Sequence, residues 1–356
     1  MAGLVDDNAK LVEQFNAKHM STVHNAPDFY TFKRGLMYSH RDFDLFMKRL
    51  ESGEQSAIVT GVNASGTLHL AHKPVFDTAI YFQKMHDVKV IIPISDDESY
   101  VSKKAENQEI ALRNALALTK DLLAIGLDPK KTYVVIDQIY TNIYNLAIKA
   151  SRHMTMSEIK AIYGYKNEEN IGLHFYPAVQ SAHVMLPEEI FGIKNTLVPI
   201  GPDEDTHLRA ARDIAARMGY AKPAVIHVRF LPGLDAEKMS KSRNNSIFFH
   251  DDPKAAAKKI MGAFSGGRAT VEEHRKFGGD PDVDVSYTFL KYFYLNEKEA
   301  KKIHASYKSG EMLSGEMKAM LKDKVVEELM EFQKRLLAIK KSDVEKVLLK
   351  NPEPKI

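Results

Sequence analysis

Apolar and polar positions follow two alternating patterns along the first 252 residues of the chain. Short, nearly continuous apolar runs are typical of buried strands. They occupy residues 56–60, 88–94, 132–136, 195–200 and 224–230. Stretches with helical spacing lie between them; one ends near Met85, one covers 106–125 with Gly126 just after it, and one covers 206–218. This alternation predicts an α/β fold with a Rossmann-type parallel sheet and crossover helices.

The pattern changes after about Asp252, where strand-like runs stop. Apolar residues then recur at helical spacing, at Met317, Met320, Leu321, Val325, Leu329, Phe332, Leu336 and Ile339. The run 342–345 has the pattern of a capping box that starts a last helix. We therefore predict an N-terminal extension over 1–40, a Rossmann catalytic domain over 41–252 and an all-helical domain over 253–356.

Composition excludes several classes of protein. The 356 residues are 44% hydrophobic and 27% charged, which is ordinary globular composition and long enough for two cores. The absence of cysteine excludes disulfides and thiolate metal sites. No apolar run approaches the length of a bilayer span, and the first residues lack the pattern of a signal peptide. We expect a cytoplasmic protein with no membrane partner, and a net charge of +3 is too mild to indicate nucleic-acid binding by itself.

Two short segments carry candidate chemistry. The histidine segment, residues 65–72 (SGTLHLAH), follows the first strand-like run, and the lysine segment, residues 238–242 (KMSKS), lies in a loop after Pro232 and Gly233. A strand, a glycine turn and a helix place free N–H groups and a positive dipole end beside a polyanion. Histidines three residues apart share a helical face and can donate to phosphate oxygens, while loop lysines supply charge where pyrophosphate departs.

Together the two segments resemble the paired HIGH and KMSKS signatures of class I aminoacyl-tRNA synthetases. Longer strings at 34–42, 175–180, 201–208 and 261–286 resemble the tryptophanyl-tRNA synthetases of the eukaryotic and archaeal branch. The resemblance covers nearly the whole chain from about Asp28. A histidine pair can also be half of a metal site, but without cysteine or an obvious third ligand we expect no metal bound by protein side chains.

The resemblance implies activation of an amino acid, tryptophan in this family, with ATP and Mg²⁺, followed by its transfer to tRNA without a covalent enzyme intermediate. It assigns catalysis to His69, His72, Lys238 and Lys241. It assigns ATP binding to Ser65, Gly66, Ala71, Gly201, Asp203, Met239, Ser240 and Ser242. The helical domain would bind the anticodon, and the Rossmann domains would form a symmetric homodimer.

The sequence departs from this family pattern in its amino-acid pocket and at Ala71, where a methyl group replaces a glycine against which adenine packs. Glu98 and Gln180 match residues that hold the α-ammonium group, and Glu204 replaces a third, normally glutamine. Two carboxylates near one ammonium group should repel each other and raise the pKa of one. Val59 and Pro93 stand where the family has a tyrosine and a glutamine that receive the indole N–H, and neither side chain accepts a hydrogen bond.

These departures leave three hypotheses open. The chain is a tryptophan–tRNA ligase in which another residue, for example Tyr176 or His183, takes over; a paralogue that binds ATP but has changed or lost tryptophan specificity, favouring another apolar amino acid; or a non-catalytic binding or regulatory protein on the same scaffold. The intact lysine segment argues against the third. Amino-acid-dependent exchange between ATP and pyrophosphate separates all three.

Overall fold

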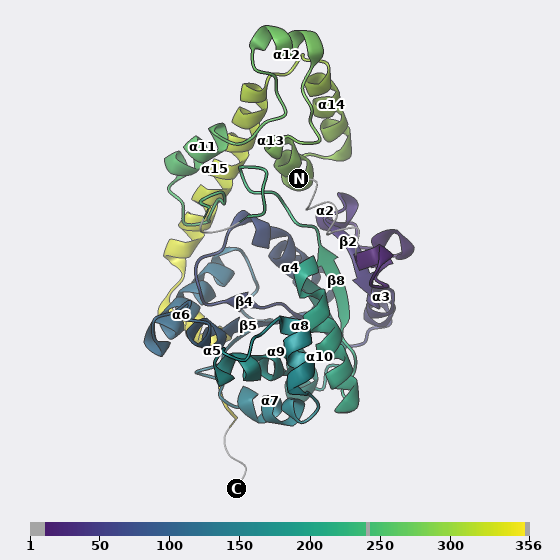
Figure 1. Ribbon diagram of the computed structural model, residues 1–356, viewed down its shortest axis with the longest axis vertical. Helices are drawn as coiled ribbons and strands as arrows, with labels where there is room; N and C mark the ends of the chain where they lie inside the picture. Colours follow the sequence, from purple (N-terminus) through teal and green to yellow (C-terminus); the bar gives the residue numbers. More distant parts are fainter. Residues whose placement is uncertain (1–10, 240–242, 353–356) are drawn as a thin grey trace.

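The computed structural model describes residues 11–239 and 243–352 and contains an eight-stranded mixed sheet in this part of the chain (Figure 1). Its strands are β1 (Lys18–His19), β2 (Met37–Arg41), β3 (Ser56–Val59), β4 (Val62–Asn63), β5 (Lys89–Ser95), β6 (Thr132–Ile136), β7 (Asn195–Ile200) and β8 (Ala224–Val228). The order β1-β2-β8-β7-β3-β5 continues with β4 and β6, which both pair with β5. The predicted strands are therefore confirmed to within a residue or two.

The central strands run parallel, and their order creates a switch point. β8, β7, β3, β5 and β6 are parallel, whereas β1 and β2 are antiparallel additions at the β8 edge. The chain moves outward from β3 to β5 and β6, and then returns to β7 on the other side of β3. In open α/β sheets, ligands bind at the carboxyl ends of strands where the order reverses in this way.

Helices cover both faces of the sheet because side chains of successive strand residues point to opposite sides. Ile58 packs into one core with α3 (Phe43–Glu51), α4 (Lys73–His86) and α6 (Gln108–Ala124). Ala57 and Val59 pack into the other with α7 (Ile143–Ser151), α9 (Ile171–Phe191) and α10 (Asp205–Arg217). Shorter helices are α2 (Tyr30–Lys33), α5 (Asp96–Val101) and α8 (Met156–Tyr163). This two-layer covering is the predicted α/β architecture.

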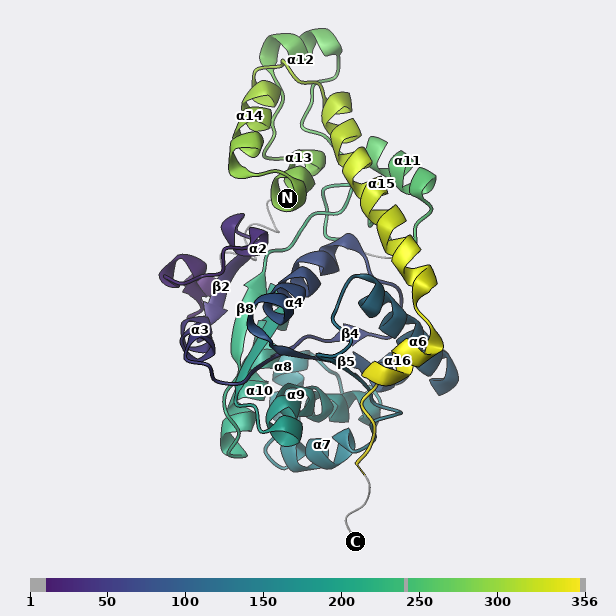
Figure 2. The same cartoon turned by 180° about the vertical axis from the view of Figure 1, so that it is seen from behind.

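The C-terminal part is helical throughout its described residues, apart from one isolated bridge at Leu348. It comprises α11 (Pro253–Met261), α12 (Val271–Phe277), α13 (Val285–Phe289), the π-helical turn η4 (Leu290–Tyr294), α14 (Glu297–Lys308), α15 (Ser314–Ala338) and α16 (Lys341–Val347). Figure 2 shows α15 running from the lobe of α12–α14 down to α6. The predicted apolar stripe is confirmed, because Met317, Leu321, Val325, Leu329 and Phe332 are fully buried.

Both ends of the described chain lie against the sheet. β2 pairs with β8, so the predicted boundary at residue 40 falls inside a sheet strand. The N–H of Leu349 donates to the carbonyl of Val134 on β6. The predicted cap of the last helix was misplaced: α16 begins at Lys341, and the carboxylate that reaches back is Asp343, which accepts from the N–H of Lys340. Within the described residues, no helix is long and apolar enough to span a bilayer.

Candidate active site

A cavity of about 460 Å³ opens at the switch point, beside the carboxyl ends of β3, β5 and β7. This volume suits a small ligand. The five residues expected to bind an amino acid all line it: Val59, Pro93, Glu98, Gln180 and Glu204. They come from five separate places in the chain, so only the fold brings them together.

One end of this cavity is polar. Glu98, near the start of α5, is buried and accepts hydrogen bonds from Asn63 and, at 2.9 Å, from Lys104 Nζ. Gln180 on α9 accepts from the Tyr163 hydroxyl through Oε1, at 2.8 Å. The sequence carried no signal for Asn63, Lys104 or Tyr163, because each is defined by a contact that forms only in the folded chain.

Glu204 faces this polar end from η3 (Pro202–Glu204), the turn that follows β7. Removal of its carboxylate from bulk water, together with the charge of Asp203, raises the pKa of Glu204 above its usual value. A raised pKa was expected, but its expected cause was Glu98. The neighbouring charge that acts on Glu204 is Asp203 instead, because the two residues are adjacent in one short turn.

The opposite end of the cavity is apolar. Val59 and Pro93 are buried on the neighbouring strands β3 and β5, and Val184, Val198 and Ile200 also line the cavity. Two polar side chains of α9 line the cavity as well. The Tyr176 hydroxyl lies 2.9 Å from Ser95 Oγ, and His183 Nε2 lies 2.8 Å from Asp137 Oδ1.

Three carboxyl groups lie beside His183. Asp96, Asp97 and Asp137 each place one oxygen within 4.8 Å of the other two, close enough to hold a cation. Asp96 accepts from the N–H of Asp137 and from the side-chain amide of Gln138, so both of its oxygens are used. Burial and the charge of Asp137 raise the pKa of Asp97 to about 8. Sequence reasoning missed this cluster, whose members come from the ends of β5 and β6.

The histidine segment has a different local conformation from the predicted helical face. His69 has an extended backbone, with φ −126° and ψ 168°, and precedes the 3-10 turn η2 (Leu70–His72). The prediction that both histidines lie on a helix was therefore wrong, because α4 begins only at Lys73, next to Pro74. The two rings nevertheless lie together, with centroids 3.9 Å apart, and His72 Nδ1 accepts from the N–H of His69 at 3.1 Å.

Backbone hydrogen bonds join the histidine segment to the chain just beyond the lysine segment. The N–H of Leu70 donates to the carbonyl of Ile247, and the N–H of Phe249 donates to that of Leu68, both at 3.0 Å. Residues far apart in sequence are thereby tied at one edge of the sheet.

The remaining residues predicted to bind ATP lie around the carboxyl edge of the sheet. Lys238 Nζ lies 3.3 Å from Asp203 Oδ2 and 4.6 Å from the centre of the Phe230 ring, so the lysine segment contacts the turn after β7 through Lys238 and Asp203. Met239 packs against the main core. Ser65 and Gly66 form the turn after β4, Ala71 lies within η2, and Gly201 immediately precedes η3. Ser240, Lys241 and Ser242 lie outside the described residues.

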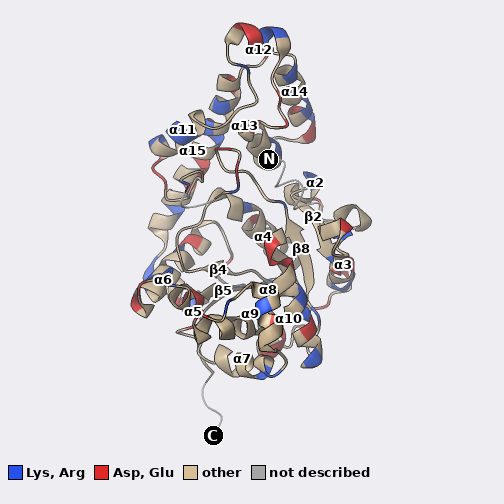
Figure 3. Ribbon diagram, in the orientation of Figure 1, with Lys and Arg blue, Asp and Glu red and all other residues tan. Residues whose placement is uncertain are grey.

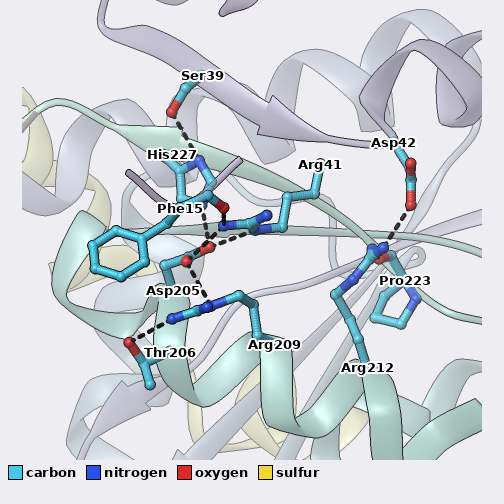
Figure 4. A network of polar contacts seen from close by, with 10 residues as sticks. All are labelled: Phe15, Ser39, Arg41, Asp42, Asp205, Thr206, Arg209, Arg212, Pro223 and His227. Carbon is cyan, nitrogen blue, oxygen red and sulfur yellow. Dashed lines mark hydrogen bonds and ion pairs between the residues drawn. The ribbon is translucent and has the colours of Figure 1, made fainter. Parts of the chain in front are cut away.

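A buried polar network fixes the base of this site (Figure 4). Asp205, the first residue of α10, accepts two hydrogen bonds from Arg41 on β2, at 2.7 and 2.8 Å, and lies 2.9 Å from His227 Nε2 on β8. These partners hold the pKa of Asp205 well below its usual range. Because Asp205 directly follows Asp203 and Glu204, the network anchors the turn that carries both. The N-terminal strand β2 therefore supports the site.

This arrangement defines a class of protein. A parallel sheet whose carboxyl edge carries a His-x-x-His segment, tied to the chain that follows a KMSKS segment, with helices after it, is the architecture of a class I aminoacyl-tRNA synthetase. The model of the family "tRNA synthetases class I (W and Y)" matches residues 51–330. The chain belongs to this family, and within it to the tryptophanyl type of enzyme.

Individual relatives support this placement. The chain is similar to tryptophan–tRNA ligase 2 of Halobacterium salinarum, with 40% identity over 94% of this chain and 88% of the relative. It is 37% identical to tryptophan–tRNA ligase of Sulfolobus acidocaldarius over 90% of this chain and 86% of the relative. The crystal structure of tryptophanyl-tRNA synthetase from Aeropyrum pernix matches with a TM-score of 0.90 and 33% identity over 98% of each chain. These findings give no support to a paralogue of changed specificity or to a non-catalytic protein.

Proposed function

We propose that this protein activates tryptophan with ATP and transfers it to tRNA. The observation that carries the proposal is one continuous edge of the sheet, where the cavity with Glu98 and Gln180 is lined by Asp203, which pairs with Lys238, and the histidine segment is tied to the chain just beyond the lysine segment. A carboxylate and an amide suit an α-ammonium group, while imidazole and lysine side chains suit phosphates. Such a site can hold an amino acid and ATP side by side.

The proposed reaction has two steps. The carboxylate of the amino acid attacks the α-phosphate in line, giving aminoacyl-adenylate and pyrophosphate. A hydroxyl of the terminal adenosine of tRNA then takes the aminoacyl group and releases AMP. Positioned charge provides most of the catalysis in reactions of this type.

The proposed roles follow from the positions of the residues. His69 and His72 would donate to phosphate oxygens, and Lys238 and Lys241 would hold the departing pyrophosphate. Asp203 would contact the ribose once its contact with Lys238 opens. That opening costs little, because both side chains are more than half exposed and exposed ion pairs contribute about 0–1 kcal/mol.

The rest of the ATP subsite would be formed by backbone and small side chains. Ser65, Gly66, Ala71, Gly201, Met239, Ser240 and Ser242 would line the nucleotide. Mg²⁺ would neutralise charge on the β- and γ-phosphates, held by phosphate oxygens and water, as is usual for this ion.

The helical part, 253–356, would contact the anticodon region of tRNA. Figure 3 shows positions occupied by Lys and Arg along the ribbons of α11, α12 and α15, interspersed with acidic positions. Mixed charge of this kind supports contacts with phosphates at a few places rather than along a uniformly basic face. We also propose a cytoplasmic, two-fold homodimer formed through the Rossmann domains; a concentration-independent mass of 40.2 kDa by light scattering would exclude it.

Amino-acid-dependent exchange between ATP and pyrophosphate tests the proposed activity. Each of the twenty amino acids is offered separately to the full chain with ATP, Mg²⁺ and labelled pyrophosphate. We expect exchange with tryptophan and with no other amino acid at comparable concentration. Exchange with another amino acid alone would establish changed specificity, and exchange with none would establish loss of activation.

A further inference from the structure

The apolar end of the cavity presents a specific chemical problem, if the proposed function holds. An indole ring carries one N–H donor, and a buried donor without an acceptor is costly. Val59, Pro93, Val184, Val198 and Ile200 offer no side-chain acceptor. An acceptor for the indole must therefore come from another polar group on the cavity wall.

Tyr176 and His183 are the two polar side chains that α9 offers beside this apolar wall, besides Gln180 at the polar end. The Tyr176 hydroxyl already lies 2.9 Å from Ser95 Oγ. His183 uses only Nε2, which lies 2.8 Å from Asp137 Oδ1. His183 Nδ1 makes no hydrogen bond to a described residue. This nitrogen is not completely buried, and because His183 lines the cavity, Nδ1 is accessible from there.

The protonation of the acidic cluster determines which nitrogen of His183 carries hydrogen. Asp137 Oδ2 is buried and receives no hydrogen bond from an N–H or hydroxyl group in the described part of the chain, but it faces the carboxyl group of Asp97. Burial raises the pKa of both acids; the charge of Asp137 adds to the rise at Asp97, whose pKa is about 8, and the charge of Asp96 adds to the rise at Asp137. A proton held between the carboxyl group of Asp97 and Asp137 Oδ2 leaves Asp137 Oδ1 as an acceptor for His183.

Because Oδ1 accepts, Nε2 of His183 must be the donor. Burial lowers the pKa of the His183 imidazole to about 4, so the ring is neutral and carries only that one hydrogen. Nδ1 then presents a lone pair toward the cavity.

We propose that His183 Nδ1 accepts the indole N–H of tryptophan, and that Asp137 fixes the ring for this role. His183 is then the residue that determines side-chain specificity, in place of the acceptors expected at positions 59 and 93. The inference rests on the proposed function, because it concerns the same substrate in the same cavity. It explains how tryptophan can be selected by a wall that otherwise offers only shape.

The experiment compares tryptophan with β-(3-benzothienyl)alanine, in which sulfur replaces the indole N–H and the shape is nearly unchanged. The chain contains no tryptophan, so the fluorescence of bound tryptophan reports binding directly, and the analogue is measured by competition. The intact protein should bind tryptophan at least about tenfold more tightly than the analogue, because a site built to accept a hydrogen bond discriminates against a ligand that cannot donate one. Equal affinities would overturn the proposal.

Two substitutions of His183 test the roles of its two ring nitrogens separately. His183→Gln keeps a donor near Nε2 for Asp137 but removes the acceptor at Nδ1, so discrimination should fall to within about threefold. His183→Asn keeps an acceptor near Nδ1 and should retain part of the discrimination. Thermal unfolding shows whether each variant is folded, and the ligand ratio is insensitive to a uniform loss of stability. Discrimination that survives in folded His183→Gln would overturn the proposal.

Matched controls address the neighbouring groups. Tyr176→Phe should keep the discrimination, and its loss in this variant but not in His183→Gln would transfer the role to Tyr176. Asp97→Asn keeps a donor toward Asp137, so this variant should also keep the discrimination between the two ligands. The proposed function fails separately: if the intact chain shows no tryptophan-dependent exchange, the activity is wrong, whereas exchange with discrimination that is independent of His183 refutes this inference alone.

Discussion

The phosphate edge and the amino-acid cavity of this enzyme adjoin each other but are built in opposite ways. The phosphate edge is made from two short segments, joined by backbone hydrogen bonds between 68–70 and 247–249 and carrying exposed or partly exposed charge. The amino-acid cavity is made from single side chains on β3, β5, α5, α9 and η3. Each segment of the phosphate edge is a short run of neighbouring residues, whereas the residues of the cavity are dispersed along the chain.

This contrast shows which parts of a binding site tolerate a change of residue type. Phosphates demand positive charge and N–H donors at short range, and few residue types supply them. A side-chain pocket is defined mainly by volume, with one or two hydrogen bonds whose source can move from strand to helix. In this chain the acceptors expected on β3 and β5 are absent, while His183 on α9 offers one.

The largest expected effect lies at the phosphate edge. Lys241→Ala should slow adenylate formation by about two to three powers of ten, and Lys238→Ala by a similar factor, because each removes one preorganised charge from the transition state. ATP affinity should change much less, since this charge acts mainly where new charge develops. Rapid-quench measurement of adenylate formation, with ATP binding measured separately, tests both. Exposed Lys254→Ala on α11 is the control, and equal losses in binding and rate would contradict this role.

The next effect concerns the polar end of the cavity. Glu98→Gln should weaken tryptophan binding by about thirtyfold, because hydrogen bonds to charged groups contribute roughly 1.5–3 kcal/mol. Indole-3-propionate lacks the ammonium group and should bind the variant and the parent alike. Competition against the fluorescence of bound tryptophan provides both affinities. Equal weakening of the two ligands would show that Glu98 supports the cavity rather than the ammonium group.

A third prediction uses pH to probe the acids beneath the apolar end. The folded protein keeps a proton on Asp97 up to about pH 8, whereas the unfolded chain loses it near 3.8. The folded state therefore binds more protons, and stability should fall as pH rises from 6.5 to 8, by up to about 1.4 kcal/mol per pH unit from this group. Lowered histidine pKa values act oppositely, but only below 6.5.

Urea unfolding at several pH values between 6.5 and 8 measures this dependence. Asp97→Asn should flatten the slope, because asparagine does not titrate but can still donate toward Asp137. Asp87→Asn, at an exposed end of α4, is the matched control and should leave the slope unchanged in this pH range. A slope that persists in Asp97→Asn would assign the proton to another group, such as Glu204 or Asp96, whose pKa values are also raised.

The smallest effect is expected from restoring the missing acceptors. In the parent, Val59→Tyr with Pro93→Gln should improve tryptophan affinity by less than about tenfold, because His183 already satisfies the single indole N–H. In the His183→Gln background the same pair should recover most of the lost discrimination. A large gain in the parent would show that the indole N–H has no acceptor there, as the sequence alone suggests.

Local sequence was sufficient for much of the fold. The runs 132–136 and 195–200 matched β6 and β7 at both ends, and the C′ position predicted for Gly126 agrees with its φ of +111°. Patterns over five to twenty residues carry this information because strands and helices expose one periodic face to a core. The histidine segment was less predictable, since Pro74 starts α4 later than the apolar spacing indicated.

By itself, the sequence determined the family, the parallel sheet, the helical C-terminal part and the chemical type of the phosphate edge, because each rests on residues that are close together in the chain. Tertiary structure decided the rest. Asn63 reaches Glu98 and Asp203 meets Lys238 only in the folded chain, and His183 is oriented by Asp137 only after β6 and α9 have packed together. Burial then sets the protonation of these acids and of the imidazole, and burial is a property of the folded chain alone.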